Sequence, residues 1–305
     1  MATKQFNVVK NILIKSIFDE NIIHIILTEY WKDLKNKRKV LLHWIDIDKI
    51  EWDSICLNPN SIDLLENNID KINWSAVCCN HNAINLIKKY LKEDELDEDE
   101  YYNFWFGLTQ NPSAIKILLK NTKKIHWTVI ARNPNAIKIL EKRLEQYSLA
   151  MQYSIIDWSI LSENPNAIHL LENNIDIIDW DNLCLNPNAI HLLENNLNKI
   201  NWTFLSKNPN AIHLLENNLD KVDWYELSTN KNAIQLIKNN LDKINWSMLS
   251  INPNAIELLD LNKINWAFLS INSNAIHILK NNQDKIDWDK LSLNPSIFED
   301  EPMPI

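Results

Sequence analysis

The eleven-residue stretch NPNAIHLLENN stands unchanged at Asn164–Asn174, Asn186–Asn196 and Asn208–Asn218. Neighbouring copies begin 22 residues apart. A fixed period of about this length is the sequence signature of a repeat protein, in which each unit buries its apolar face against the next unit. The stretch therefore predicts a stack of similar units rather than one conventional globular core.

Each unit begins at a tryptophan, and its consensus is W-x-x-L-S-x-N-P-N-A-I-x-L-L-E-N-N-x-D-K-I-[ND]. Positions within a unit are numbered below from this tryptophan as position 1. Eleven residues mark the unit starts: Trp52, Trp74, Trp105, Trp127, Trp158, Trp180, Trp202, Trp224, Trp246, Trp266 and Trp288. Insertions near residues 92–100 and 145–153 lengthen two of the units. We expect the repeats to span residues 45–294.

Two short helices fit this unit. The first starts at the tryptophan and is capped by the preceding Asn or Asp, as at Asn73 and Asp157. The second starts at NPN, where Asn is the expected N-cap and Pro suits the first helical position. Its apolar positions 10, 11, 13 and 14 form one face at helical spacing. The Asn residues that follow are expected to end this helix in the left-handed conformation.

These features predict an all-α fold, an α-solenoid of about eleven 22-residue repeats. Each repeat would pair an α-helix with a short α-helix or 3-10 helix. We expect the tryptophans to be buried between successive repeats. With helices about 8–10 Å apart, eleven repeats would form a rod or arc on the order of 90–100 Å long.

The two ends of the chain do not repeat. Residues 1–44 are expected to form an N-terminal helical cap, and RKVLLHWI at residues 38–45 to be one of its helices. The next stretch, IDIDKIEW at residues 45–52, already matches the closing residues of a unit. Residues 295–305 are expected to be an acidic C-terminal tail, which would give the last repeat a polar outer face.

Composition excludes several classes of site. A single glycine, Gly107, cannot supply a phosphate-binding glycine loop. The net charge is −9, but ten of the 40 acids lie in Glu93–Glu100 and Glu299–Glu301, which leaves 30 acids against 31 Lys and Arg. This balance predicts no nucleic-acid partner. We expect the run Glu93–Glu100 to be a solvated loop, since it lacks the pattern of a calcium loop.

Targeting signals are equally sparse. No apolar run reaches 18 residues, so we expect no membrane span. The N-terminus lacks the residue order of a signal peptide. Four cysteines in a chain of 305 residues without such a signal indicate free thiols inside a cell.

The repeated unit resembles a family expanded in giant DNA viruses of amoebae, of the mimivirus type. Proteins of that family carry tandem W-x-x-L-S-x-N-P-N-A-I-x-L-L units, and the match covers about residues 45–295. The segment L-S-x-N-P followed by a short helix is more distantly similar to the leucine-rich repeat variant. This resemblance implies a helical solenoid and a viral protein in the cytoplasm of an infected host cell. It implies no catalytic residues.

Two residue types are candidates for chemistry. His169, His191 and His213 occupy position 12, which should face solvent, and they could share a metal ion or belong to a contact surface. Helical separation leaves little freedom for Zn–N bonds of about 2.0–2.1 Å, so we predict no metal and no cofactor. Cys56, Cys78 and Cys184 fill the small position 5, Cys79 is adjacent to Cys78, and none of the four has an evident histidine partner. We therefore predict no catalytic residues.

Residues that differ between units are the candidates for recognition. Positions 3 and 6 carry apolar side chains in several units, and exposed apolar side chains often mark binding sites. The densest group comprises Phe204, Met248, Ile251, Phe268 and Ile271. Our leading hypothesis is a non-catalytic scaffold that binds a protein or peptide through these residues, with the position-12 histidines nearby. The alternatives are a nucleic-acid-binding helical-repeat protein and, last, an enzyme.

Overall fold

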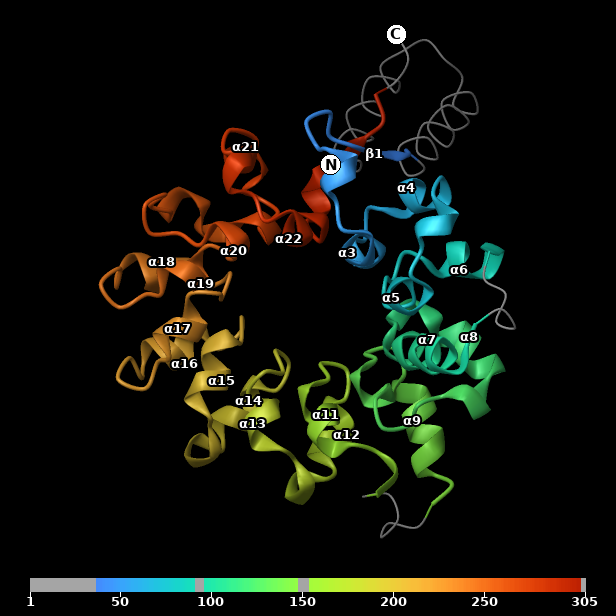
Figure 1. The fold of residues 1–305 in the computed structure, drawn as a ribbon. Coiled ribbons are helices and arrows are strands. Elements are labelled where there is room, and N and C mark those ends of the chain that lie inside the picture. The colour runs from blue at the N-terminus through green and yellow to red at the C-terminus, as the bar shows by residue number, and fades with distance from the viewer. Residues whose placement is uncertain (1–36, 91–95, 148–153, 303–305) are drawn as a thin grey trace, which may run out of the picture. The chain divides into compact units, whose positions relative to one another are not determined.

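The computed structural model describes residues 37–90, 96–147 and 154–302. Short helices follow one another in regular succession, as the all-α prediction requires (Figure 1). The chain divides into two compact units. One unit is Trp44–Ile297, and the other combines Met1–His43 with Phe298–Ile305.

The first helix of most units begins at the tryptophan, as predicted. These first helices are α3 (Trp52–Leu57), α5 (Trp74–Val77), α11 (Trp158–Glu163), α13 (Trp180–Leu183), α15 (Trp202–Lys207), α17 (Trp224–Leu227), α19 (Trp246–Leu249), α20 (Trp266–Ile271) and α22 (Trp288–Ser292). The unit of Trp127 has the 3-10 helix η6 (Ile130–Arg132) instead. The predicted caps are confirmed: Asn201 Oδ1, for example, accepts a hydrogen bond of 3.3 Å from the Phe204 amide.

The second helices begin later than predicted, at position 11 instead of at NPN. They are α4 (Ile62–Glu66), α6 (Ile84–Tyr90), α8 (Ile115–Lys120), α9 (Ile137–Leu144), α12 (Ile168–Glu172), α14 (Ile190–Glu194), α16 (Ile212–Glu216), α18 (Ile234–Lys238) and α21 (Ile276–Lys280). The NPN residues form a turn, because Asn164 Oδ1 accepts from the Asn166 amide at 3.0 Å and the Asn164 carbonyl from the Ala167 amide at 3.1 Å. Asparagine thus caps a turn that leads into the helix.

Proline begins a 3-10 helix in three units, namely η4 (Pro112–Ala114), η9 (Pro253–Leu258) and η11 (Pro295–Ile297). Further 3-10 turns, which the sequence did not predict, stand at positions 18–20: η1 (Ile47–Lys49), η2 (Ile69–Lys71), η5 (Thr122–Lys124), η7 (Ile175–Ile177), η8 (Leu197–Lys199) and η10 (Gln283–Lys285). The predicted left-handed asparagines are wrong, since no described residue has positive φ. Instead, Asn174 Nδ2 donates to the Leu170 carbonyl at 2.8 Å and so satisfies the helix end.

The core is built from positions 4, 10 and 14. In the unit of Trp202 these are Leu205, Ala211 and Leu215, each 0% exposed. The tryptophans contribute less than predicted, because only Trp105 and Trp158 are buried and the other unit-starting tryptophans are half-buried. The small alanine lets neighbouring helices approach closely, so leucine fills the core and most of the larger indole rings lie at its edge.

The succession of helices in Trp44–Ile297 returns on itself (Figure 1), with α22 packed against α3. This contact contradicts the expected open rod or arc. Figure 1 shows first helices such as α20 on the inner side of the circle and second helices such as α21 on its outer side. The face of the last repeat that was expected to be a polar end surface is instead covered by the first repeat, since α3 packs against α22.

The described residues at the chain ends form two short strands. Strand β1 (Lys39–Leu41) pairs antiparallel with β2 (Phe298–Asp300), and Lys39 Nζ lies 2.6 Å from Asp300 Oδ1. The predicted helix at residues 38–45 is therefore wrong, and part of the predicted tail, residues 295–305, is ordered. Pairing of β1 with β2 satisfies the backbone N–H and C=O groups of both segments, and this long-range pairing is not visible in the local sequence. The remainder of the predicted cap, residues 1–36, lies outside the described residues.

The first insertion also differs from the expected loop. Helix α7 (Glu98–Gln110) incorporates the end of the acidic run Glu93–Glu100 as its first turn. Asp97 Oδ1 accepts from the Glu100 amide at 2.8 Å, and Glu100 Oε2 accepts from the Asp97 amide at 3.2 Å. This capping box and the favourable interaction of acids with a helix N-terminus explain why acidic residues start a helix here. Residues 91–95 and 148–153, in the two insertions, lie outside the described residues.

Candidate functional site: the surfaces of the repeat unit

Position 7 forms a continuous asparagine ladder through the repeats. Its eleven asparagines are Asn58, Asn80, Asn111, Asn133, Asn164, Asn186, Asn208, Asn230, Asn252, Asn272 and Asn294, and all are buried. Asn208 Nδ2 donates to the carbonyls of Cys184 at 2.8 Å and Asn186 at 3.0 Å, both in the preceding unit. The Asn208 carbonyl in turn accepts from Asn230 Nδ2 at 3.0 Å. These asparagines are thus used by the fold and are unavailable to a ligand.

The ladder closes at the chain ends with the same geometry. Asn58 Nδ2 donates to the carbonyls of Ser292 at 2.8 Å and Asn294 at 3.0 Å. Residues just before the first repeat complete the last one. The Glu51 amide donates to Ser292 Oγ at 2.9 Å, and Lys49 Nζ lies 5.1 Å from the centre of the Trp288 ring. The match of residues 45–52 to the end of a unit is explained by this composite last repeat.

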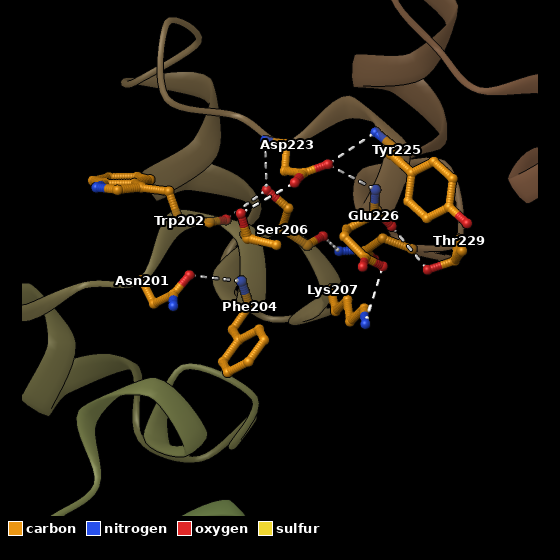
Figure 2. Close-up of polar contacts among 11 residues, drawn as sticks. Asn201, Trp202, Phe204, Ser206, Lys207, Asp223, Tyr225, Glu226 and Thr229 are labelled. Carbon is orange, nitrogen blue, oxygen red and sulfur yellow. Dashed lines mark hydrogen bonds and ion pairs between the residues drawn. The ribbon is translucent and has the colours of Figure 1, made fainter.

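Serine at position 5 connects three parts of one repeat. Ser206 Oγ donates to the Trp202 carbonyl at 2.8 Å and accepts from the Asp223 amide at 3.0 Å (Figure 2). Asp223 then caps α17 by accepting from the Tyr225 and Glu226 amides, both at 3.1 Å. Figure 2 shows that these bonds link the end of one repeat to the start of the next.

Lysine at position 20 covers many of the half-buried tryptophans. Lys221 Nζ lies 4.8 Å from the centre of the Trp202 ring, and Lys199 lies 4.3 Å from that of Trp180. The consensus D-K-I therefore has a structural role in protecting the exposed ring faces through cation–π contacts.

The five apolar candidates for partner binding all lie on or just after first helices. Phe204, Met248, Ile251, Phe268 and Ile271 are each half-buried. Figure 2 shows the Phe204 ring pointing away from the hydrogen bonds of Ser206. Part of this surface is already covered, because Lys290 Nζ lies 5.1 Å from the centre of the Phe268 ring. These residues occupy positions 3 and 6 of three units, those that begin at Trp202, Trp246 and Trp266.

The position-12 histidines are exposed, as predicted, but each faces a glutamate of the preceding unit. Three such pairs join Nε2 to Oε1: His169–Glu141 at 2.7 Å, His191–Glu172 at 2.8 Å and His213–Glu194 at 2.7 Å. Glutamate at position 15 therefore competes with any metal ion for these rings. Among the described residues, no group of three or more His, Cys, Asp or Glu side chains has the arrangement of a metal site.

The cysteines fall into two classes. Cys56 and Cys184 are fully buried, and burial raises the pKa of each thiol to about 11. Cys78 is also buried, and its thiol donates to the Ser75 carbonyl at 2.8 Å. Cys79 is exposed, and interaction with the adjacent Cys78 side chain lowers the pKa of its thiol to about 7. Residue 107 lies so close to Cys78 and Cys79 that glycine is required there. A Cβ at this position would lie 2.4 Å from Cys78 Sγ and 2.8 Å from Cys79 Sγ.

A basic outer face lies on the second helices α6, α8 and α9 and on the 3-10 turn η5, and sequence reasoning missed it. It is formed by Lys88, Lys116, Lys120, Lys123, Lys138, Lys142 and Arg143. All of its lysines are exposed. The signal was present in the sequence, since residues 105–147 hold eight Lys or Arg and two acids. Averaging the charge over the whole repeat region concealed this concentration.

In the part of the chain that the structure describes, no helix is long and apolar enough to cross a membrane. Comparison with protein-family models, with curated proteins and with solved structures gives no match to this chain.

Proposed function

We propose that the chain is a closed α-solenoid of eleven repeats that acts as a non-catalytic scaffold for a protein or peptide partner. The observation that carries this proposal is the closed asparagine ladder. It uses the positions that all units share, such as Asn58 and Asn208, in buried hydrogen bonds between neighbouring repeats. Specificity for a partner is therefore assigned to the positions that differ between units, which lie at the surface.

Rigid presentation of variable surface side chains suits recognition better than catalysis. Binding costs less when the contact surface is already ordered. The position-12 histidines and position-15 glutamates pair with each other between units and form no convergent pocket. Resemblance of the repeated unit to giant-virus proteins supports a role inside an infected host cell.

A pull-down from host-cell lysate followed by mass spectrometry tests the scaffold role. We expect a specific protein partner to be recovered with the unaltered chain. If the partner binds the apolar first-helix surface, the double variant Phe204→Ser, Phe268→Ser should lose most of it while keeping its circular dichroism spectrum. Thr203→Ala, an exposed neighbour on α15, is the matched control. Failure to recover any protein above background would contradict the scaffold proposal.

A further inference from the structure

Two hollows lie side by side on the basic outer face. The first, of about 370 Å³, is lined by Leu119 of α8, by Trp127, and by Ile139, Lys142 and Arg143 of α9, among others. The second, of about 610 Å³, is lined by residues of α6 and α8 that again include Leu119. Leu119 therefore separates the hollows, and its side chain is 52% exposed.

Each hollow is lined by both aliphatic and cationic side chains. Ile117 and Leu119 line the second hollow between Lys88, Lys116 and Lys120. At the first hollow, the buried Nε–H of Arg143 has no acceptor among the described residues. The Arg143 guanidinium lies against the Trp127 and Tyr147 rings and adds positive charge beside this hollow.

Acidic side chains beside this face are few, apart from Glu98 at the start of α7, which lines a neighbouring hollow with Lys123 and Lys124. Residues 105–147 contain only two acids, Glu141 and Glu145. Glu141 is already engaged, because its Oε1 lies 2.7 Å from His169 Nε2. Unbalanced positive charge attracts a negative partner and speeds its association.

Nucleic acid fits this face less well than a peptide. Binding of unpaired bases relies on open aromatic rings for stacking. The rings at the two hollows are covered by cations: the Arg143 guanidinium lies 4.5 Å from the centre of Trp127 and 4.6 Å from that of Tyr147. The exposed ring of Tyr102 lies instead at a separate hollow beside Glu98. Aliphatic floors offer a base no partner, but they can accept leucine-like side chains.

We propose that the basic outer face binds an acidic peptide whose aliphatic side chains enter the two hollows on either side of Leu119. The inference rests on the proposed scaffold function and names the chemistry of one partner. Helices packed about 8–10 Å apart place α6 and α9 about 16–20 Å from each other. An extended segment of about six residues spans that distance.

Fluorescence anisotropy with a labelled 12-residue peptide tests the proposal. The peptide contains four leucines, each separated from the next by two acidic residues. We expect micromolar binding that weakens as salt is raised. Lys116→Glu with Lys142→Glu should lower the affinity at least tenfold. Leu119→Ser should lower it about fivefold, because an aliphatic contact is lost.

Matched controls separate specific binding from general attraction. Lys238→Glu with Lys280→Glu makes the same charge change at exposed positions of α18 and α21, and should alter the affinity less than twofold. Replacing the four leucines of the peptide by serine should weaken binding at least fivefold. Circular dichroism of every variant checks folding.

Several outcomes would overturn the proposal. Equal binding of the leucine-free peptide, or no effect of Leu119→Ser, would mean that charge alone attracts the peptide. Tighter binding of a 12-nucleotide oligothymidine would assign the face to nucleic acid. No binding of the peptide would also reject it. The scaffold role would still stand if the pull-down recovered a partner that depends on Phe204 and Phe268.

Discussion

Asparagine at position 7 shows how one residue type meets several demands together. Its Oδ1 caps the NPN turn, as when Asn208 Oδ1 accepts from the Asn210 amide at 2.9 Å. Its Nδ2 supplies two hydrogen bonds to the preceding unit. Aspartate lacks these donors, and glutamine places them one methylene further from the backbone. The same asparagine in all eleven units follows from this combination.

Replacing this asparagine should therefore cost more than the loss of a cap. We expect Asn208→Ala to lower the free energy of unfolding by about 2–4 kcal/mol, because buried carbonyls of Cys184 and Asn186 lose their donor. Asn210→Ala, at an exposed position with one bond to the preceding unit, should cost about 1 kcal/mol. Urea unfolding measures both. Similar values for the two variants would show that burial of the ladder is unimportant.

Cys79 should be the most reactive thiol of the chain near neutral pH. Interaction with the Cys78 side chain lowers the pKa of its thiol to about 7, and the thiolate is the nucleophile. The rate of alkylation by iodoacetamide should therefore rise with pH, reach half its maximum near pH 7, and level off above it. In Cys78→Ala the midpoint should move upward, because that interaction is removed. Mass spectrometry locates the modified residue, and an unchanged midpoint in the variant would reject the stated cause.

The individual elements are shorter than a stable isolated helix. Most first helices have four to six residues, as in α5 (Trp74–Val77) and α15 (Trp202–Lys207). Helices of this length are unstable alone in water, so their order depends on caps and on packing between repeats. Helix α7 (Glu98–Gln110) is longer because an acidic insertion adds turns before its tryptophan.

The start of α7 should depend on its capping box. Asp97→Ala removes the acceptor for the Glu100 amide, which lies 2.8 Å from Asp97 Oδ1, and should cost about 1 kcal/mol of local stability. Hydrogen exchange of the first-turn amides should become several-fold faster, whereas exchange in α15 should not change. Unchanged exchange at Glu100 would mean that packing alone holds this turn.

In the compact unit Trp44–Ile297, which contains all the repeats, closure gives every repeat two neighbours. The last repeat takes its closing residues, including Lys49 and Glu51, from the start of the chain. A composite repeat holds the two ends of the array together by long-range contacts. Repeats in open arrays unfold more easily at their ends, where one neighbour is missing.

Because the array of repeats is closed, a residue at the junction of its ends should contribute as much to the free energy of unfolding as one within the array. Asn58→Ala should lower the free energy of unfolding by about the same amount as Asn208→Ala, about 2–4 kcal/mol, because Asn58 makes the same two bonds to Ser292 and Asn294. Urea unfolding of the two variants provides the comparison. A much smaller effect of Asn58→Ala would show that the ends separate readily in solution.

The sequence by itself determined the repeat period, the helical class and the caps of the first helices. These depend on local patterns, namely the spacing of apolar residues and the Asn or Asp before each tryptophan. It also placed the histidines at exposed positions. Among the partner candidates, residues such as Phe204 and Ile271 were identified from variation between units, and the structure leaves their role a prediction.

Only the tertiary structure decided closure, the ladder and the basic outer face. Curvature is the sum of small rotations at each contact between repeats, and no local pattern specifies that sum. Asn58 and Asn294 lie 236 residues apart, so their hydrogen bond exists only because the rotations bring the last unit back to the first. Likewise, lysines of separate helices such as Lys116 and Lys142 act as one surface because the stacking of repeats places them side by side.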